Sequence, residues 1–343
     1  MSYAVHVPTR ARTARHAGGL LLLGAAVALV ALASLAWGVR DLSAPTVWHA
    51  LVSPVAGDND HLVVRDLRVP RTVLGVVAGA ALGLAGAVMQ GLTRNPIADP
   101  GLLGVNSGAS LAVVVAITWL GVSHPVGYVW FAFAGAAVAA VVVYGIASAG
   151  WEGPTPVRLA LVGAAFTAVA TSLITLVVLG NLSTLDQYRF WSVGSLVGRP
   201  LGTATLLAPF LAVGAVLALG SGRLLNALAS GDDVARGLGI HVGRGRVVAM
   251  LAVVLLCGSA TALVGPIAFV GLVVPHLARA VIGPDYRWLL PYSALLGAAL
   301  LLAADVAGRL LVQPAELEAG LVAAVLGAPV MIALVRRTRP VAL

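Results

Sequence analysis

The polar residues that could do chemistry gather in a few short stretches, and the longest after residue 200 is Ser221–Arg246. Within it, Ser230 is predicted to cap a short helix whose first turn holds Asp232 and Asp233, where the helix dipole favours negative charge. The candidate residues of this helix and its end are Ser230, Asp232, Asp233, Val234, Ala235, Arg236, Gly237, Leu238 and Gly239. Two interpretations remain open: an ordinary solvated helix, or a surface that docks a soluble partner.

A second group of candidates is basic. Arg65, Arg68 and Arg71 precede one apolar run, and Arg309 follows Asp305 by four residues within another. Four residues bring two side chains onto one helix face, so an ion pair within the helix is predicted there. Arginines at the end of a membrane segment also extend toward lipid headgroups. The remaining alternative is a basic patch that receives an acidic partner.

Several kinds of chemistry are excluded by what the sequence lacks. All 21 Lys and Arg residues are arginines, and a P-loop requires a lysine, so any ATP-driven step needs a separate polypeptide. The single cysteine, Cys257, allows no internal disulfide, and the seven histidines are scattered. We therefore predict no cofactor and no metal site. No GxSxG motif, HExxH motif or pair of intramembrane aspartates is present, so an enzyme is not predicted.

The composition is that of a membrane protein that crosses the bilayer many times. Hydrophobic residues make up 60% of the 343 residues and charged residues only 10%, against about 25% charged in soluble domains. The net charge of +8 is spread over short loops and not over one face. It therefore indicates orientation in a membrane and not nucleic-acid binding.

The apolar runs predict an all-α fold of about ten transmembrane helices in one domain over residues 1–343. The predicted spans are 17–37, 72–92, 102–120, 126–148, a fifth ending near 179, 201–219, 247–264, 266–279, 288–311 and 319–335. A short extra helix is predicted after Ser43. In the second span, Gly75, Gly79 and Gly83 have the spacing of closely packed helices.

Arginines orient these spans. Those near the N-terminus predict a cytoplasmic tail at residues 1–16, an external segment at 38–70 and a cytoplasmic loop at 221–246, with the C-terminus also cytoplasmic. A cleaved signal peptide is the competing reading of the first run, since residues 31–33 resemble a cleavage site. An uncleaved helix is preferred because further spans follow.

A faint repeat joins the two halves. Residues 96–103, PIADPGLL, are similar to residues 266–273, PIAFVGLV. The predicted topology puts the first copy on the inner side and the second on the outer side. That is the arrangement of an inverted repeat of helices two to five and seven to ten.

These motifs resemble those of the FecCD-type (BtuC-like) permease family over nearly the whole chain after residue 60. The resemblance is carried by LRVPR at 67–71, GAVMQGLTRNPIADPGLLGVN at 86–106, ARGLGI at 235–240, GPI at 265–267, PH at 275–276 and GAP at 327–329. The structural motif residues are Asn95, Pro96, Asp99, Pro100, Gly101, Gly265, Pro266 and Pro275.

The resemblance implies the permease fold of a type II ABC importer in a bacterial cytoplasmic membrane. It implies a second permease subunit, two ATPase subunits that dock on residues 230–239, and a periplasmic or lipid-anchored binding protein that docks on Arg68, Arg71 and Arg309. The implied cargo is an iron–siderophore, with haem or cobalamin as alternatives within the family. One departure is Glu318, where the family usually has proline.

A transporter coupled to an ion gradient is the main rival. Such proteins carry an ionisable group within the membrane, and Asp305 is the candidate acid here. ATP dependence of uptake distinguishes the two mechanisms.

Overall fold

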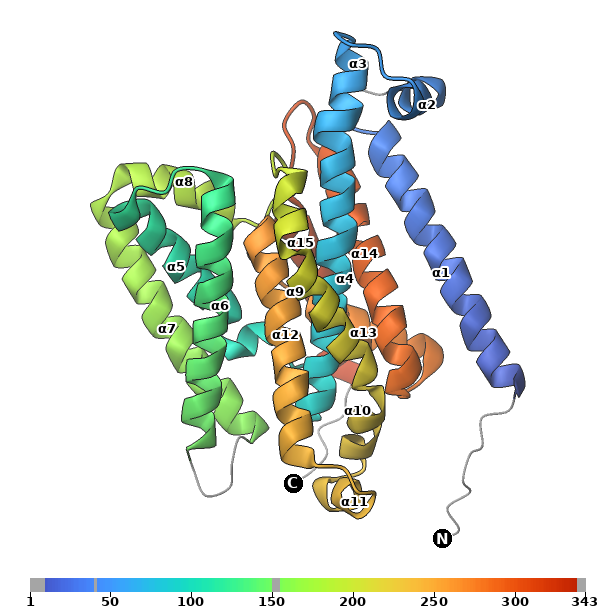
Figure 1. The fold of residues 1–343 in the computed structure, drawn as a ribbon, viewed down its shortest axis with the longest axis vertical. Helices are drawn as coiled ribbons and strands as arrows, with labels where there is room; N and C mark the ends of the chain where they lie inside the picture. Colours follow the sequence, from blue (N-terminus) through green and yellow to red (C-terminus); the bar gives the residue numbers. More distant parts are fainter. Residues whose placement is uncertain (1–9, 40–41, 150–154, 338–343) are drawn as a thin grey trace.

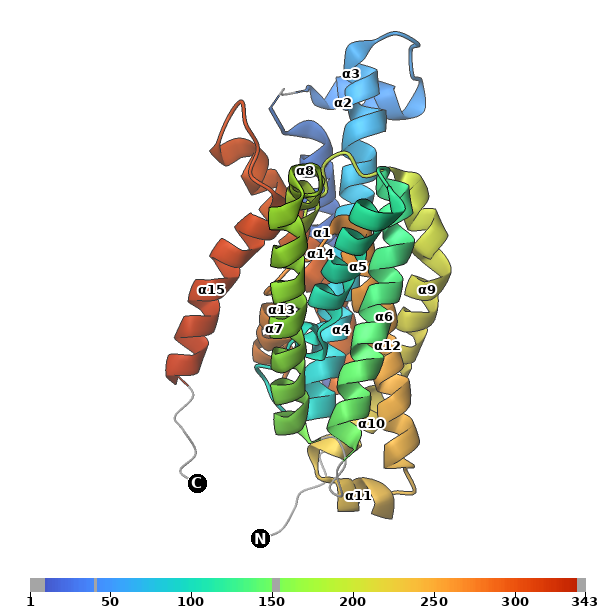
Figure 2. The ribbon, with the colours of Figure 1, turned by 90° about the vertical axis from the view of Figure 1, so that its left-hand side faces the viewer.

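The computed structural model describes residues 10–39, 42–149 and 155–337, and nearly all of them lie in helices. Figures 1 and 2 show the long helices running roughly side by side along one axis. The elements are α1 (Arg10–Ala36), α2 (Ala44–Val52), α3 (Asn59–Leu62), η1 (Val63–Arg68), α4 (Val69–Thr93), η2 (Pro100–Leu103), α5 (Val105–Leu120), α6 (Pro125–Ser148), α7 (Pro156–Gly180), α8 (Leu182–Ser192), α9 (Leu201–Gly220), α10 (Gly222–Ala229), α11 (Asp232–Gly237), α12 (Val242–Val264), α13 (Val270–Ile282), α14 (Tyr286–Leu311) and α15 (Ala319–Arg337).

Helix α4 is the centre of the bundle. It packs against α14, α12 and α13, and a Cβ atom on Gly79 would lie 2.4 Å from the carbonyl oxygen of Gly297 in α14. Only hydrogen at this position allows the two backbones to come so close, which confirms the predicted close packing. The remaining helices are arranged around this contact.

The second predicted span is longer than expected. Its helix begins at Asn59 and continues to Thr93, 35 residues in all, and Asp58 caps its first turn by accepting from the backbone N–H of Asp60. The predicted start of this span at residue 72 is therefore wrong, because the helix already begins at Asn59, whereas the outer position of residues 38–70 stays a prediction. The predicted short helix after Ser43 is confirmed as α2, with Ser43 as its cap.

Seven helices of the described residues are long and apolar enough to cross a membrane, and three shorter apolar helices accompany them. The shortest, α13, has 13 residues, which span about 20 Å of the roughly 30 Å hydrocarbon core. Its predicted start at Pro266 is wrong because residues 265–269 are not helical. The predicted tail at residues 1–16 is helical from Arg10, and residues 1–9 lie outside the described part.

A group of four helices and the single helix α1 flank the centre. Helices α5, α6, α7 and α8 pack together and meet the centre through α12, and Figure 1 shows them as the green group at one side. Helix α1 packs mainly along α14, and only 6% of its apolar window is buried. Helix α1 begins, and α15 ends, at the end of the bundle that carries α11 (Figures 1 and 2).

Candidate functional site

Helices α3 and α11 lie at opposite ends of the bundle, which we call the α3 end and the α11 end (Figure 1). The α3 end holds the arginine cluster, defined as Arg68, Arg71 and Arg309 with Asp305 and Glu316. The α11 end holds the 221–246 segment. The predicted site residues of each group are therefore brought together, with the length of the bundle between the groups.

Asp305 is the fully buried anion of the arginine cluster. The Nε atom of Arg71 donates to both carboxylate oxygens of Asp305, at 2.8 and 2.9 Å. Arg309, one helical turn further along α14, donates to the same carboxylate through Nε and Nη2, which confirms the predicted pair. Arg71 also donates from Nη1 to Glu316 at 2.5 Å. The two acids thus bind two of the three arginines, Arg71 and Arg309.

The carbonyl end of α1 accepts hydrogen bonds from the other guanidinium donors. Arg68 donates from Nη1 to the carbonyl oxygens of Leu35 and Ala36, both at 2.7 Å. Arg309 donates to the carbonyl oxygens of Ser34 and Trp37 at 2.8 and 3.2 Å. The last carbonyls of a helix lack partners within it and carry partial negative charge. The C-terminal end of α1 therefore offsets part of the cluster's positive charge.

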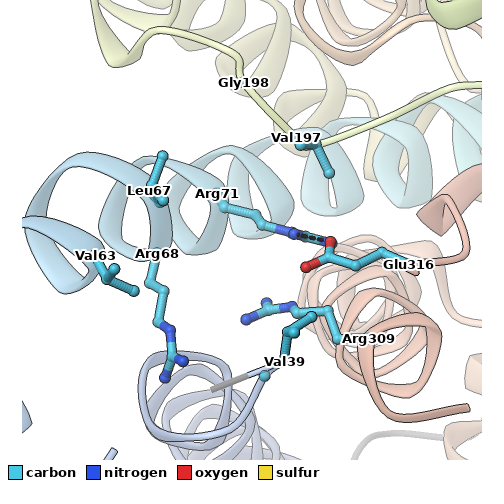
Figure 3. Close-up of a pocket in the computed structure, with 10 residues that line it drawn as sticks. Val39, Val63, Leu67, Arg68, Arg71, Val197, Gly198, Arg309 and Glu316 are labelled. Carbon is cyan, nitrogen blue, oxygen red and sulfur yellow. Dashed lines mark hydrogen bonds and ion pairs between the residues drawn. The ribbon is translucent and has the colours of Figure 1, made fainter. Parts of the chain in front are cut away.

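The arginine cluster borders a cavity of about 270 Å³. Figure 3 shows Arg71 directed at Glu316 with Arg309 beside them, and Arg68 turned toward the end of α1. The three arginines are at most 8% exposed, whereas Arg65 at the same end is exposed. The sequence indicated no partners for Arg68 and Arg71, because the carbonyl and acidic groups that bind them lie far away along the chain.

Glu318 lies at a second cavity of the α3 end, about 330 Å³ in volume, which Arg199 also lines. Burial lowers the pKa of the Arg199 guanidinium below its usual value, and the nearby charge of Glu318 partly offsets this. The negative charge of Glu318 therefore favours the charged form of Arg199 at this cavity.

At the α11 end, Asp232 fastens α11 to the bundle. Its carboxylate pairs with Arg94, the residue that ends α4, and with Arg246 of α12 at 3.0 Å. Arg94 adopts a left-handed backbone conformation with φ of 51°, which directs the chain out of α4 just before Asn95. Asp232 thus connects α11 to two central helices, a role that its place in a first turn does not predict.

The outward face of α11 is formed by the neighbouring residues. The Asp233 side chain is 99% exposed and pairs only with Arg236 on its own helix among the described residues. Val234 and Leu238 are 49% and 67% exposed, whereas Ala235 is fully buried. The predicted cap at Ser230 is wrong, because Gly231 occupies the cap position and no side chain caps this helix.

Helix α10 was not predicted. Leu225 and Leu228 are fully buried, and their three-residue spacing is the signal that could have revealed it. The amide of Asn226 donates to Asp285 at 2.6 Å and accepts from the backbone N–H of Tyr286 at 2.9 Å. The 221–246 segment is therefore attached to α14 as well as to α4 and α12.

The two similar motifs meet inside the bundle. Asp99 caps η2 by accepting from the N–H of Gly101 at 2.7 Å, and Asn95 accepts from the N–H of residue 97. A Cβ atom on Gly271, in the second motif, would lie 3.2 Å from Pro100 and 3.4 Å from the Asp99 carboxylate. The start of η2, in the first motif, thus packs against the first turn of α13, in the second motif.

Other motif residues shape the second break. Gly265 has φ of 81°, and a Cβ there would lie 2.3 Å from the carbonyl oxygen of Trp191, so glycine is required. Pro266 follows it, and Pro275 lies buried inside α13. Among the described residues, no three His, Cys, Asp or Glu side chains are grouped to hold a metal ion.

The chain is similar to known transport proteins over most of its length. It is 49% identical over 321 residues to the ferric enterobactin transport system permease protein FepD of Escherichia coli K12, covering 93% of this chain and 94% of that protein. It is 42% identical to a probable siderophore transport system permease protein, YfiZ, of Bacillus subtilis, covering 89% and 91%. It is 38% identical to the hemin transport system permease protein HmuU of Yersinia pestis, covering 94% and 95%.

The fold is also that of a solved transporter. An inward-facing structure of a proposed metal-chelate type ABC transporter superposes with a TM-score of 0.81 at 24% identity, covering 94% of this chain and 99% of that one. Residues 26–337 match the FecCD transport family. Matched across almost its whole described length, the chain belongs to the FecCD transport family of membrane permeases.

Proposed function

We propose that the chain is the permease subunit of an ABC importer that moves an iron–siderophore across the cytoplasmic membrane. The observation that carries this proposal is the near full-length similarity to permeases named for siderophore and ferric enterobactin transport. The permease binds its cargo without changing it covalently. Two copies, or one copy and a related chain, enclose the path.

ATP hydrolysis takes place on separate subunits that dock on α11. Asp233, Val234 and Leu238 supply an exposed acidic and apolar face. The chain's lack of lysine rules out its own P-loop. Displacement of α11 passes through Asp232 to Arg94 and Arg246, and so to the ends of α4 and α12, which switch the opening of the path.

A binding protein docks at the α3 end through its acidic residues. Arg65 is the exposed cation that meets it first. Because Arg68, Arg71 and Arg309 are already hydrogen-bonded, an incoming carboxylate reaches Arg71 by replacing Glu316, whose side chain is 29% exposed. Docking thereby alters the contacts that hold α14 and the loop before α15.

Docking is tested by the association rate of the purified chain with its binding protein at several salt concentrations. Arg65→Gln is expected to slow association several-fold, with a weaker salt dependence, because an exposed charge acts mainly by steering. Arg189→Gln is the matched control, since Arg189 already pairs with Asp186 on its own helix. Equal rates for the two variants would remove Arg65 from the docking surface.

Transport is tested in vesicles containing the chain, its ATPase and its binding protein. Uptake of ferric enterobactin, ferric citrate, a ferric hydroxamate and hemin is compared with and without ATP. ATP-dependent uptake of one of the three ferric chelates supports the proposal, and uptake of hemin alone assigns the haem branch. Uptake that requires a proton gradient and does not depend on ATP would contradict the ABC-importer proposal. Asp305 would then be the candidate proton-binding residue.

ATPase docking has its own test, namely the affinity of the ATPase for the detergent-solubilised chain. Leu238→Ser is expected to weaken binding about ten-fold or more, because it removes an exposed apolar contact. Leu62→Ser alters a similarly exposed leucine at the opposite end and leaves the affinity unchanged. Equal affinities for both variants contradict the assignment of α11.

A further inference from the structure

A cavity of about 580 Å³ lies between α1 and the adjoining parts of α13 and α14. Its lining comprises Arg15, His16, Gly18, Gly19, Leu22, Val281, Ile282 and Tyr292. Tyr292 lies in the first turns of α14, and Asn226 of α10 binds the start of that helix. The cavity therefore belongs to the α11 end of the bundle and is separate from both groups of proposed site residues.

The polar part of the lining is basic and incompletely paired. Arg15 is exposed, and none of the described residues that line the cavity is acidic. His16 is 9% exposed, and its Nδ1 atom is buried without a hydrogen-bond partner. Its ring lies 5.3 Å from the ring of Trp288, and its carbonyl oxygen accepts from the Tyr292 hydroxyl at 2.9 Å. A buried donor or acceptor left without a partner is unfavourable, so a ligand that pairs with it is stabilised.

The rest of the lining is apolar and faces outward. Leu22 and Val281 are 75% and 71% exposed, on helices that the apolar composition places in the bilayer. Gly18 has no atom within 4 Å of the position of a Cβ, so α1 leaves open space there. A basic and aromatic rim above apolar walls at the end of a membrane helix matches the headgroup and upper acyl chain of a lipid.

We propose that this cavity is a binding site for an anionic glycerophospholipid. The lipid phosphate pairs with the Arg15 guanidinium and accepts a hydrogen bond from the N–H group at Nδ1 of His16. One acyl chain follows Leu22 and Val281 along the outside of the bundle. A free phosphate offers the same charge but leaves the apolar walls uncovered, so the lipid is the better ligand.

Such a lipid joins α1 to α13. These two helices form no substantial contact of their own, because α1 packs chiefly on α14. A lipid held by residues 15 and 16 and by residue 281 fills the space between them. Removal of the lipid is therefore expected to loosen the beginning of α1 and to leave the α3 end, where arginines hold α1, unchanged.

The test uses the full chain, freed of lipid in detergent, with phosphatidylglycerol, phosphatidylcholine or inorganic phosphate added. Phosphatidylglycerol is expected to raise the unfolding temperature saturably, and native mass spectrometry to count one retained molecule per chain. Arg15→Gln is expected to weaken this binding about five-fold or more, as is typical for one basic residue near an anionic surface. Arg287→Gln, an exposed arginine at the same end that does not line the cavity, is the matched control.

A second variant blocks the cavity sterically without changing its charge, and so separates lipid binding from a general effect of charge. Gly18→Leu fills the open space without a clash at Cβ, and it is expected to displace the lipid while Arg15 and His16 remain. Stabilisation by inorganic phosphate to the same degree would assign a free anion and overturn the lipid. Equal effects of phosphatidylcholine, or of Arg15→Gln and Arg287→Gln, would overturn the site.

Discussion

At the scale of single residues, the main feature is the buried ionic network of Asp305 with Arg71 and Arg309. Its carboxylate is fully buried and carries hydrogen bonds from two guanidinium groups. Removing one member of a buried ionic network costs more than the interaction itself contributes, because the remaining charges stay desolvated. Arg71 and Arg309 would be those remaining charges.

Asp305→Asn is therefore expected to lower the free energy of unfolding by about 3–5 kcal/mol. The measurement is an SDS unfolding titration of the purified chain. Asp186→Asn, which breaks the exposed pair with Arg189, is the control and is expected to cost less than about 1 kcal/mol. Similar losses for both variants would contradict the buried network.

Two neighbouring aspartates of α11 are expected to behave differently. Asp232→Asn removes the pairs with Arg94 and Arg246, so backbone amides of α11 should exchange hydrogen about ten-fold faster. Asp233→Asn affects only a pair within an exposed helix and should leave exchange within about two-fold. Hydrogen-exchange mass spectrometry of residues 222–240 makes the comparison, and equal rates would show that Asp232 does not hold the helix.

The sequence predicted part of these interactions. The Asp305–Arg309 pair follows from spacing on one helix, and the structure confirms it. Arg71 binds the same carboxylate from 234 residues away, and one sequence holds no signal for such a pair. For the same reason, the sequence placed Asp232 and Asp233 together in the first turn of a helix and did not distinguish Asp232 as the residue that pairs with Arg94 and Arg246.

At the scale of elements, helix ends were harder to predict than helices. The second span begins at Asn59 although Pro70 lies within it. A proline in a helix normally clashes with the preceding turn. Here the six residues before Val69 form a π-helix, in which the N–H of Val69 donates to Val64. This wider turn accommodates Pro70 and keeps the helix continuous. Because the turn contains charged residues, the sequence pattern placed it outside the span.

The contact of α4 with α13 yields an element-scale prediction. A Cβ on Gly86 would lie 1.9 Å from the carbonyl oxygen of Gly271, so Gly86→Ala must push the two helices apart. We expect a loss of about 1–3 kcal/mol in SDS unfolding. Gly145→Ala, in α6 with open space around the new methyl, should be neutral or stabilising by up to about 1 kcal/mol. A neutral Gly86→Ala would contradict the close approach.

At the scale of the whole molecule, the proposed orientation can be tested with introduced cysteines. Cys257 is the single cysteine and is 2% exposed, so it should not react with a membrane-impermeant maleimide. Asp233→Cys should be labelled only in inside-out vesicles, and Arg65→Cys only in right-side-out vesicles. Labelling of both from the same side would contradict a bundle that crosses the membrane between the α3 and α11 ends.

The capping of α1 has a consequence for the order of synthesis. Arg309 donates to a carbonyl of α1 that precedes it by 275 residues, and Arg68 donates to another that precedes it by 33. During synthesis, the hydrogen bond from Arg68 to α1 can form soon after α1 has been made. The second interaction, from Arg309, can form only after nearly all later helices have entered the membrane. The contacts that hold the end of α1 are therefore complete only after α14, which carries Arg309, has been inserted.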